Sequence, residues 1–331
     1  MKTVLTGLKP TGELTLGNYI GAILPLVKMQ EEHDSIYLFV ADLHALTIPQ
    51  ERIELNSRIR SFIAMYIACG INPEKTMIYI QSENEYIPAI SWILECTTQY
   101  GEASRMIQFK EKSKENENFS VGLLTYPVLM AADILYCDAA YVPVGVDQKQ
   151  HVELARNIAM RFNNRYGETF KLPEPLITKV GTKIKDLKEP TKKMSKSSDS
   201  PMGVITMYDT EEQITKKIMG ATTDSDMLIK FDEENKPGIS NLLNIASCMS
   251  GKTILELEKE FNGKNYGEFK RFVAKVTCEH LKGIQDKYNE LIDSGLINKI
   301  LDDGINKSRE LAKNKYLDMC KKVGITREKL N

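Results

Sequence analysis

The sequence lacks paired cysteines, a strong net charge and long apolar runs. Its six cysteines are scattered singly, without a C-x-x-C pair, so zinc and iron–sulfur sites have no support and a reducing compartment is favoured. The 44 basic and 45 acidic residues give a net charge of −1, which argues against a DNA-coating protein and confines nucleic-acid contacts to local patches. No apolar run is long enough for a membrane span or a signal peptide, so we expect a cytoplasmic protein.

The chain also lacks the two commonest nucleotide-binding motifs. Neither G-x-G-x-x-G nor G-x-x-x-x-G-K-[ST] occurs, which argues against dinucleotide-binding and P-loop proteins. What is present is an ordinary globular composition, with 42% hydrophobic and 27% charged residues over 331 positions. That length suffices for two domains with a sizeable core.

Hydrophobic periodicity predicts an α/β first half. Short apolar runs rich in Val, Ile and Tyr indicate buried strands at 3–8, 36–42, 76–82 and 140–145. Apolar residues at helical spacing indicate helices between them, at 18–31, 51–69, 85–100, 122–137 and 148–165. This alternation predicts a parallel sheet covered by helices on both faces, with ligands bound at the carboxyl ends of the strands.

From about residue 208 the pattern is helical only. Apolar stripes predict helices at 239–251, 253–261 and 266–294, and the stretch carries no strand pattern. We therefore predict a first domain over residues 1–205 and a helical second domain over residues 206–289. The C-terminal stretch, 290–331, is expected to pack back on the first domain.

Two stretches of the first half could bind a ligand, and each has a plain structural alternative. Residues 7–22 form a glycine-rich turn before a helix, where backbone N–H groups could hold a phosphate with help from Thr15 and Asn18. On the helix at 122–137, Tyr126, Met130 and Asp133 share one otherwise apolar face. A carboxylate there needs a partner, which could be a cap, an arginine, the domain edge or a donor on a ligand.

Three further positions are ambiguous by themselves. Asp147 and Gln148 open a helix just after a strand, where Asp147 could equally be a simple cap. His44 also follows a strand, although a lone histidine is more often structural. The stretch "TKKMSKSSDSP" at 191–201 is either a solvated turn or a mobile loop whose lysines meet a polyphosphate.

Taken together, these segments resemble the class I aminoacyl-tRNA synthetases. "TLGN" stands where that class has its His-Ile-Gly-His signature, and "KMSKS" is the second signature unaltered. Over nearly the whole chain the sequence is similar to the bacterial tryptophanyl-tRNA synthetases, in segments that include "QFKEKS", "LLTYPVLMAADIL", "VPVGVDQKQH", "EPTKKMSKS" and "KPGISNLLNI".

The resemblance implies a Rossmann-like catalytic domain with the KMSKS loop at its end and a helical domain that binds the tRNA anticodon. The tryptophan carboxylate would attack the α-phosphate of ATP, giving tryptophanyl-adenylate and pyrophosphate, and tRNA(Trp) would then take the tryptophan. Mg2+ is expected with ATP rather than on protein ligands. A homodimer is also implied, with neither a membrane nor DNA as a partner.

The resemblance also implies the site residues. The catalytic ones would be Lys193, Lys196, Lys112, Thr15 and Asn18, with the lysines stabilising the departing pyrophosphate. ATP would contact Lys9, Gly17, Asn18, Gly145, Asp147, Ile184, Lys193, Met194 and Lys196. Tryptophan would contact Leu5, Gly7, His44, Tyr126, Met130, Asp133, Ile134, Val142, Val144 and Gln148. Asp133 would accept the indole N–H, and Tyr126 and Gln148 would bind the α-amino group.

The chain departs from the family pattern at Leu5, where an aromatic is common, at Lys9, where Gln is common, and at Val146, where an acid is usual. Three alternatives stay open: a tyrosyl-tRNA synthetase, another nucleotidyltransferase of the same superfold, and a nucleotide- or tRNA-binding paralogue without activity. Met130 stands where tyrosine enzymes tend to carry Gln, and the 191–197 stretch has lost no lysine. Both observations favour an active tryptophan enzyme.

Overall fold

The computed structural model describes residues 3–10, 12–33, 35–49, 51–115, 118–145, 148–177, 183–195 and 200–327. The side chains at 52–54, 112, 114, 115 and 177 are outside this description. Three predicted site residues are therefore not placed: Asp147 and Lys196 lie outside the described residues, as does the side chain of Lys112.

Five parallel strands form one sheet. They are β1 (Thr3–Leu8), β2 (Ser35–Val40), β3 (Thr76–Ile80), β4 (Tyr141–Val144) and β5 (Glu174–Ile177), in the spatial order β3-β2-β1-β4-β5. The predicted α/β class is confirmed, and the four predicted strands occur close to their expected bounds. The sequence did not predict β5. Its four residues, EPLI, begin with a charged residue and a proline and contain no long run of branched apolar residues, and its place at the edge of the sheet tolerates Pro175.

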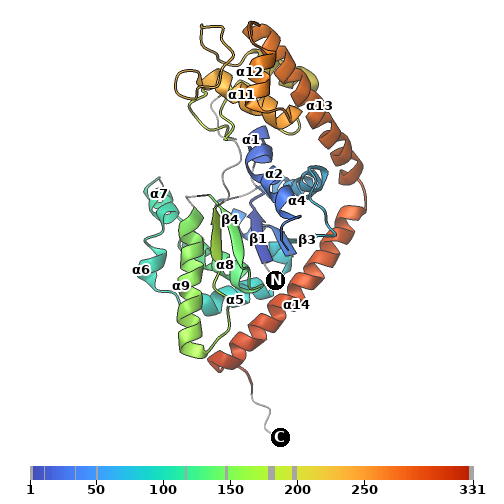
Figure 1. Cartoon of the computed structure of the whole chain (residues 1–331). Helices are drawn as coiled ribbons and strands as arrows, with labels where there is room; N and C mark the ends of the chain where they lie inside the picture. The colour runs from blue at the N-terminus through green and yellow to red at the C-terminus, as the bar shows by residue number, and fades with distance from the viewer. Residues whose placement is uncertain are drawn as a thin grey trace.

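Helices connect the strands and continue beyond the sheet (Figure 1). Those of the α/β half are α1 (Leu16–Asn18), η1 (Tyr19–Ile23), α2 (Leu24–Met29), α3 (Asp42–Ala45), α4 (Arg52–Ala68), η2 (Gln81–Glu83), α5 (Tyr86–Glu95), α6 (Tyr100–Ala103), α7 (Ile107–Glu115), α8 (Val121–Leu135) and α9 (Lys149–Tyr166). After them come η4 (Pro201–Gly203), α10 (Glu211–Met219), α11 (Pro237–Ser250), α12 (Ile254–Glu260), α13 (Tyr266–Ile292) and α14 (Leu296–Val323).

The predicted helix at 18–31 is not a single α-helix. It is divided into α1, the π-helical turn η1 and α2. Pro25 lies in the first turn of α2 and has no N–H to donate to the preceding turn, so a regular α-helical ladder cannot run through this point. The first signature segment therefore sits at a change of helical register, a feature often found at functional sites.

Alternation along the strands divides the core into two layers. Val4 and Leu38 belong to one buried cluster, whereas their neighbours Leu5 and Phe39 belong to another on the opposite face. Helices α5, α8 and α9 contact one another in that order along this face, and they supply the second cluster together with buried residues of α14. None of the described helices is long and apolar enough to cross a membrane.

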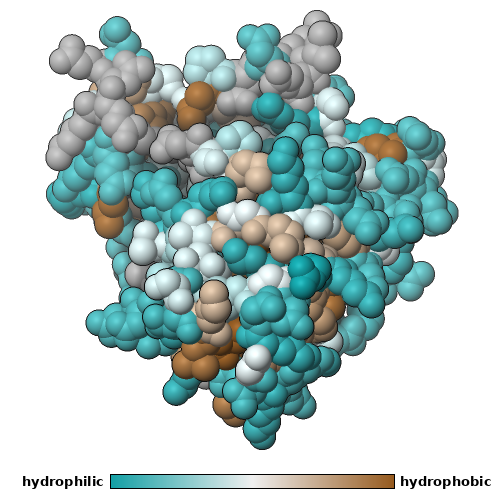
Figure 2. Space-filling view, turned by 90° about the horizontal axis from the view of Figure 1, so that it is seen from above, coloured by the Kyte–Doolittle hydropathy of each residue, from teal (hydrophilic) through white to brown (hydrophobic). Residues whose placement is uncertain are grey.

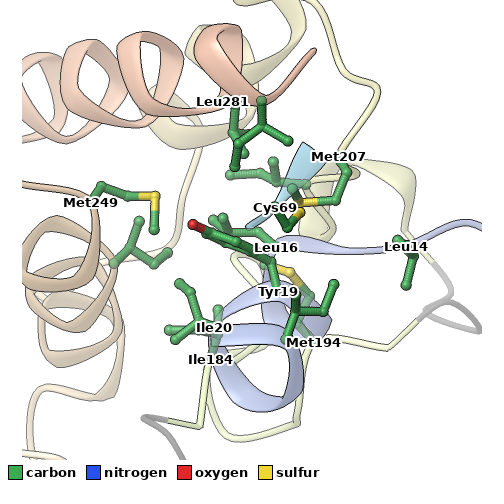
Figure 3. Close-up of a cluster of buried hydrophobic side chains, with 14 of the residues drawn as sticks. Leu14, Leu16, Tyr19, Ile20, Cys69, Ile184, Met194, Met207, Met249 and Leu281 are labelled. Carbon is green, nitrogen blue, oxygen red and sulfur yellow. The ribbon is translucent and has the colours of Figure 1, made fainter. Parts of the chain in front are cut away.

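The first cluster extends from the sheet into the helical region. Leu16 of the first signature and the adjacent Tyr19 gather with Met194 of the second and with Met249 of α11 and Leu281 of α13 (Figure 3). Helix α13 leads away from this region to α14, which runs back along the sheet and contacts β3 and α5 (Figure 1). Residues distant in sequence thus share one continuous core around both signatures.

Candidate active site

A cavity of about 480 Å³ lies at the carboxyl ends of β1, β2 and β4, where ligands are expected in a parallel sheet. All ten residues assigned to tryptophan line it, namely Leu5, Gly7, His44, Tyr126, Met130, Asp133, Ile134, Val142, Val144 and Gln148. Two residues assigned to ATP, Lys9 and Gly145, also line it, together with Thr6, Phe39, Ala41, Thr47, Gln108 and Pro143. The structure therefore brings together side chains that are far apart in sequence.

Gly7 is required by the shape of this cavity. A Cβ atom at position 7 would lie 2.6 Å from Cζ of Phe39, well inside van der Waals contact. The absence of a side chain lets the Phe39 ring lie directly against β1. Phe39 in turn stacks on Tyr79, with ring centroids 5.8 Å apart, so Tyr79 holds the Phe39 ring in place in the cavity wall.

Asp133 is a fully buried carboxylate in the wall of the cavity. Nε2 of Gln81 donates to both of its oxygens, at 2.9 and 2.8 Å, and Nε2 of His44 lies 3.0 Å from Oδ2. Burial raises the pKa of the Asp133 carboxyl, while the hydrogen bonds from His44 and Gln81 lower it. The protein partners are therefore an amide and an imidazole, not the cap or arginine that the sequence suggested.

The hydroxyl of Tyr126 is held by two side chains from other helices. It donates to Oε1 of Gln108 on α7 at 3.0 Å and lies 2.8 Å from Nε2 of His151 on α9. Burial raises the pKa of Tyr126 to about 12, so the phenol remains neutral at physiological pH. His151 is itself 1% exposed, which places it beneath the cavity as a support for Tyr126.

Two residues of this network were missed from the sequence. Gln81 directly follows β3, so the rule that ligand-binding groups gather after parallel strands could have found it. Gln108 belongs to the quoted "QFKEKS" segment, but its local sequence shows only a charged helix. Nothing in that pattern indicates that α7 turns Gln108 towards Tyr126.

The two signature segments meet at Gly17. A Cβ atom on Gly17 would lie 3.4 Å from Cβ of Met194, so the segments are in close contact. Thr15 caps α1: its Oγ1 accepts from the N–H of Asn18, and Oδ1 of Asn18 accepts from the N–H of Thr15, both at 3.1 Å. The N–H of Leu16 donates to the carbonyl of Ile205 at 2.8 Å, which ties the first signature to the chain beyond the second.

The residues assigned to ATP thus fall into two groups. Lys9 and Gly145 lie in the cavity, whereas Gly17, Ile184 and Met194 lie where the signatures meet. The side chains of Ile184 and Met194 are buried in the hydrophobic cluster (Figure 3). Lys193 is exposed and pairs with Lys185 in an antiparallel bridge. Within the described residues, no group of three or more His, Cys, Asp or Glu side chains could hold a metal ion.

Comparison with known proteins identifies the family of this chain. The sequence model of the tRNA synthetases class I (W and Y) matches residues 1–282. The tryptophan–tRNA ligase of Bacillus anthracis is 47% identical over 99% of this chain and 100% of its own length, and that of Bacillus subtilis is 48% identical over 99% of each.

Solved structures show the same likeness. Tryptophanyl-tRNA synthetase of Mycoplasma pneumoniae has a TM-score of 0.86 at 34% identity, over 98% of both chains. The Campylobacter jejuni enzyme complexed with ADP and tryptophan has a TM-score of 0.84 at 36% identity, over 97% of this chain and 99% of its own. The chain therefore belongs to the class I aminoacyl-tRNA synthetases, in the family of the bacterial tryptophan–tRNA ligases.

Proposed function

We propose that the cavity around Asp133 binds L-tryptophan and that the chain joins it to tRNA(Trp) in two steps, as a tryptophan–tRNA ligase. The carboxylate of tryptophan attacks the α-phosphate of ATP, pyrophosphate leaves, and the terminal ribose of the tRNA takes the acyl group from the adenylate. The observation that carries this proposal is the buried carboxylate of Asp133 in the wall of an otherwise largely apolar cavity.

The position of Asp133 explains selection for an indole. A ligand that donates an N–H to this buried acceptor binds more tightly than one that leaves the carboxylate desolvated without a further hydrogen bond. Gln81 and His44 orient its oxygens, and a carboxylate has lone pairs for a further donor. Met130, Val142 and their apolar neighbours would enclose the ring, while Tyr126 and Gln148 would receive the α-amino group.

The tyrosine alternative is less well supported. The curated relatives at 47–48% identity are tryptophan–tRNA ligases, whereas the tyrosyl-tRNA synthetase of Archaeoglobus fulgidus is 21% identical and shares the fold alone. Tyrosine could place its phenol near Asp133, but Met130 offers that hydroxyl only a weak thioether acceptor.

Catalysis in this proposal rests on position and charge rather than on a covalent nucleophile. The segment from Thr15 to Asn18 would lie against the nucleotide, and Lys193 and Lys196 would stabilise the charge on the leaving pyrophosphate. Lys112 would approach from α7. Mg2+ would arrive with ATP, because phosphate oxygens are the hard ligands that this ion prefers.

The proposal is tested by ATP–pyrophosphate exchange with each of the twenty amino acids. We expect exchange that depends on tryptophan and is far weaker with tyrosine and phenylalanine, because neither ligand carries an indole N–H. Exchange driven best by tyrosine would favour the alternative, and no exchange with any amino acid would indicate a paralogue without activity.

We further propose that residues 206–289 bind the tRNA anticodon. In the view towards α11 and α12, the surface is mostly hydrophilic and its apolar residues form small separate patches (Figure 2). Such a surface suits contacts with phosphates and exposed bases. A cytoplasmic location fits this partner and the six free cysteines, which indicate a reducing compartment.

A homodimer is the proposed working form. Leu46 and Trp92 are large apolar side chains that are 60% and 67% exposed, and they line one shallow cavity near α5 and α8. Exposed apolar patches of this kind mark protein interfaces.

Trp92→Glu should therefore convert a dimer to a monomer, as measured by size-exclusion chromatography with light scattering. Leu255→Glu is the matched control, because Leu255 on α12 is 68% exposed and lies elsewhere. A dimer that survives Trp92→Glu would place the interface on another surface.

A further inference from the structure

The segment "KPGISNLLNI" contains a buried polar side chain that the proposed mechanism does not use. Asn241, on α11, is 2% exposed. Its Oδ1 accepts the backbone N–H of Lys185 at 2.8 Å, and its Nδ2 donates to the backbone carbonyl of Lys185 at 2.9 Å. The side-chain amide of Asn241 thus bonds both the N–H and the C=O of Lys185, and these two contacts together fix the position of the Lys185 backbone.

Lys185 stands in the stem that leads into the KMSKS loop. We define this stem as residues 184–186 and 192–194, which pair as a short antiparallel hairpin. The N–H of Met194 donates to the carbonyl of Ile184, and the N–H of Asp186 donates to that of Lys192, both at 3.0 Å. Lys185 and Lys193 are direct partners in this pairing.

The geometry of the hairpin explains why Asn241 is needed. Along an antiparallel pair, successive residues direct their peptide groups alternately towards the partner strand and away from it. Ile184 and Asp186 bond across the stem, so the peptide groups of Lys185 face the other side, where Asn241 meets them. The side chain of Asn241 therefore takes the place of a third strand.

The stem is fixed at its other sides as well. Oδ1 of Asp186 accepts the N–H groups of Lys188 and Glu189, at 2.7 and 3.0 Å, and closes the turn. Met194 lies against Gly17 in the first signature. The stem is thus held between α1 on one side and α11 on the other, within the cluster shown in Figure 3.

We propose that Asn241 is a positioning residue for Lys193, the first lysine of the KMSKS signature. It fixes the register of the stem, and through the pairing of Lys185 with Lys193 it fixes the backbone from which the Lys193 side chain extends. This inference rests on the proposed function, in which Lys193 acts on the leaving pyrophosphate. Because the tryptophan cavity is built by other elements, the effect of Asn241 falls on the chemical step rather than on tryptophan binding.

Asn241→Asp is the informative substitution. It keeps the size of the side chain and the acceptor for the N–H of Lys185, but it sets an acceptor against the carbonyl of Lys185 where a donor stood. We expect kcat for tryptophan-dependent pyrophosphate exchange to fall by about 10- to 100-fold, since misplacement by about 1 Å has effects of this size. The KM for tryptophan should stay within about twofold.

Asn244→Asp is the matched control. Asn244 lies one turn further along α11 and is 7% exposed, so the same change adds the same buried charge to the same helix. A general loss of stability would affect both variants alike. A specific positioning role predicts the fall in kcat only at Asn241, at a temperature where circular dichroism shows both variants to be folded.

Hydrogen–deuterium exchange on the unaltered protein gives a second test that needs no variant. The amide of Lys185 should exchange far more slowly than an exposed amide. If the amide of Lys185 exchanged hydrogen as fast as an exposed amide, the contact with Asn241 would be overturned. Equal losses of kcat in the two variants, or an unchanged kcat in Asn241→Asp, would overturn the positioning role. If the unaltered protein shows no pyrophosphate exchange, the proposed function fails instead, and the hydrogen-exchange rate of the Lys185 amide still decides whether Asn241 bonds it.

Discussion

At the scale of single residues, Asp133 combines a functional position with a cost in stability. Burial raises the pKa of its carboxyl, so the folded protein holds a proton at pH values where the unfolded chain has released it. The free energy of unfolding must therefore decrease as pH rises from the unfolded pKa, about 3.9, through the folded one. The buried carboxylate that we propose for ligand binding therefore makes the folded protein less stable at neutral pH than at low pH, as far as this group is concerned.

Asp133→Asn should remove that gradient. Oε1 of Gln81 is buried without a hydrogen-bond partner among the described residues, so a flip of the Gln81 amide can accept from the introduced NH2 group. We expect the variant to be more stable than the unaltered protein at neutral pH and to lose this advantage towards pH 4. Thermal unfolding across this pH range measures the difference. A constant offset at every pH would mean that Asp133 titrates normally.

Lys9 is the second residue with a distinct prediction. It lines the cavity at the end of β1, where the carboxylate of tryptophan and the α-phosphate should meet. Lys9→Gln should weaken binding of a non-hydrolysable tryptophanyl-adenylate analogue by roughly 1–2 kcal/mol, in the range of a hydrogen bond to a charged group. Isothermal titration calorimetry at low and moderate salt measures this. Unchanged affinity would show that the ammonium group makes no contact with the bound analogue.

At the scale of elements, the contact of α14 with β3 depends on one glycine. A Cβ atom on Gly304 would lie 1.8 Å from the carbonyl oxygen of Ile78, so α14 lies directly against the strand backbone. Gly304→Ala should force the two elements apart and cost about 1–3 kcal/mol. The matched change Gly283→Ala, in α13, meets open space and should stabilise by up to about 1 kcal/mol.

Thermal midpoints of the two glycine variants provide the measurement. Gly304→Ala should melt several degrees below the unaltered protein, and Gly283→Ala should melt at the same temperature or above it. Equal midpoints for both variants would show that α14 can shift without loss, and that its packing on β3 is loose.

Regular elements with strong periodicity were predictable, and those governed by backbone details were not. Strands β1 to β4 each carry buried apolar residues within a short apolar run, so the pattern alone revealed them. Strand β5 carries Pro175 at an edge, and the helix at 18–31 changes register near Pro25. The face that joins Tyr126, Met130 and Asp133 followed from helical spacing, but the partners Gln81 and Gln108 come from other elements. Their approach depends on tertiary packing, which local sequence does not encode.

At the scale of the whole molecule, the proposed division between chemistry and RNA binding has a direct test. Reversing the charge of an exposed lysine such as Lys230, Lys259 or Lys275 should raise the KM for tRNA. The binding should also weaken with added salt, because phosphate contacts release counterions. Pyrophosphate exchange needs no tRNA and should be unchanged. A folded variant of this kind that loses exchange would contradict the division.

On the ribosome, β3 and α5 are made long before α14, the helix that comes to lie against them. In the finished fold Ser308 of α14 bonds both Asn84 and Tyr136 in the interior, and Gly304 abuts Ile78. Nascent chains that end before Leu296 would therefore carry an uncovered edge strand and unsatisfied polar groups. Interrupted translation should yield aggregation-prone fragments that chaperones and proteases recognise, rather than shortened enzymes with partial activity.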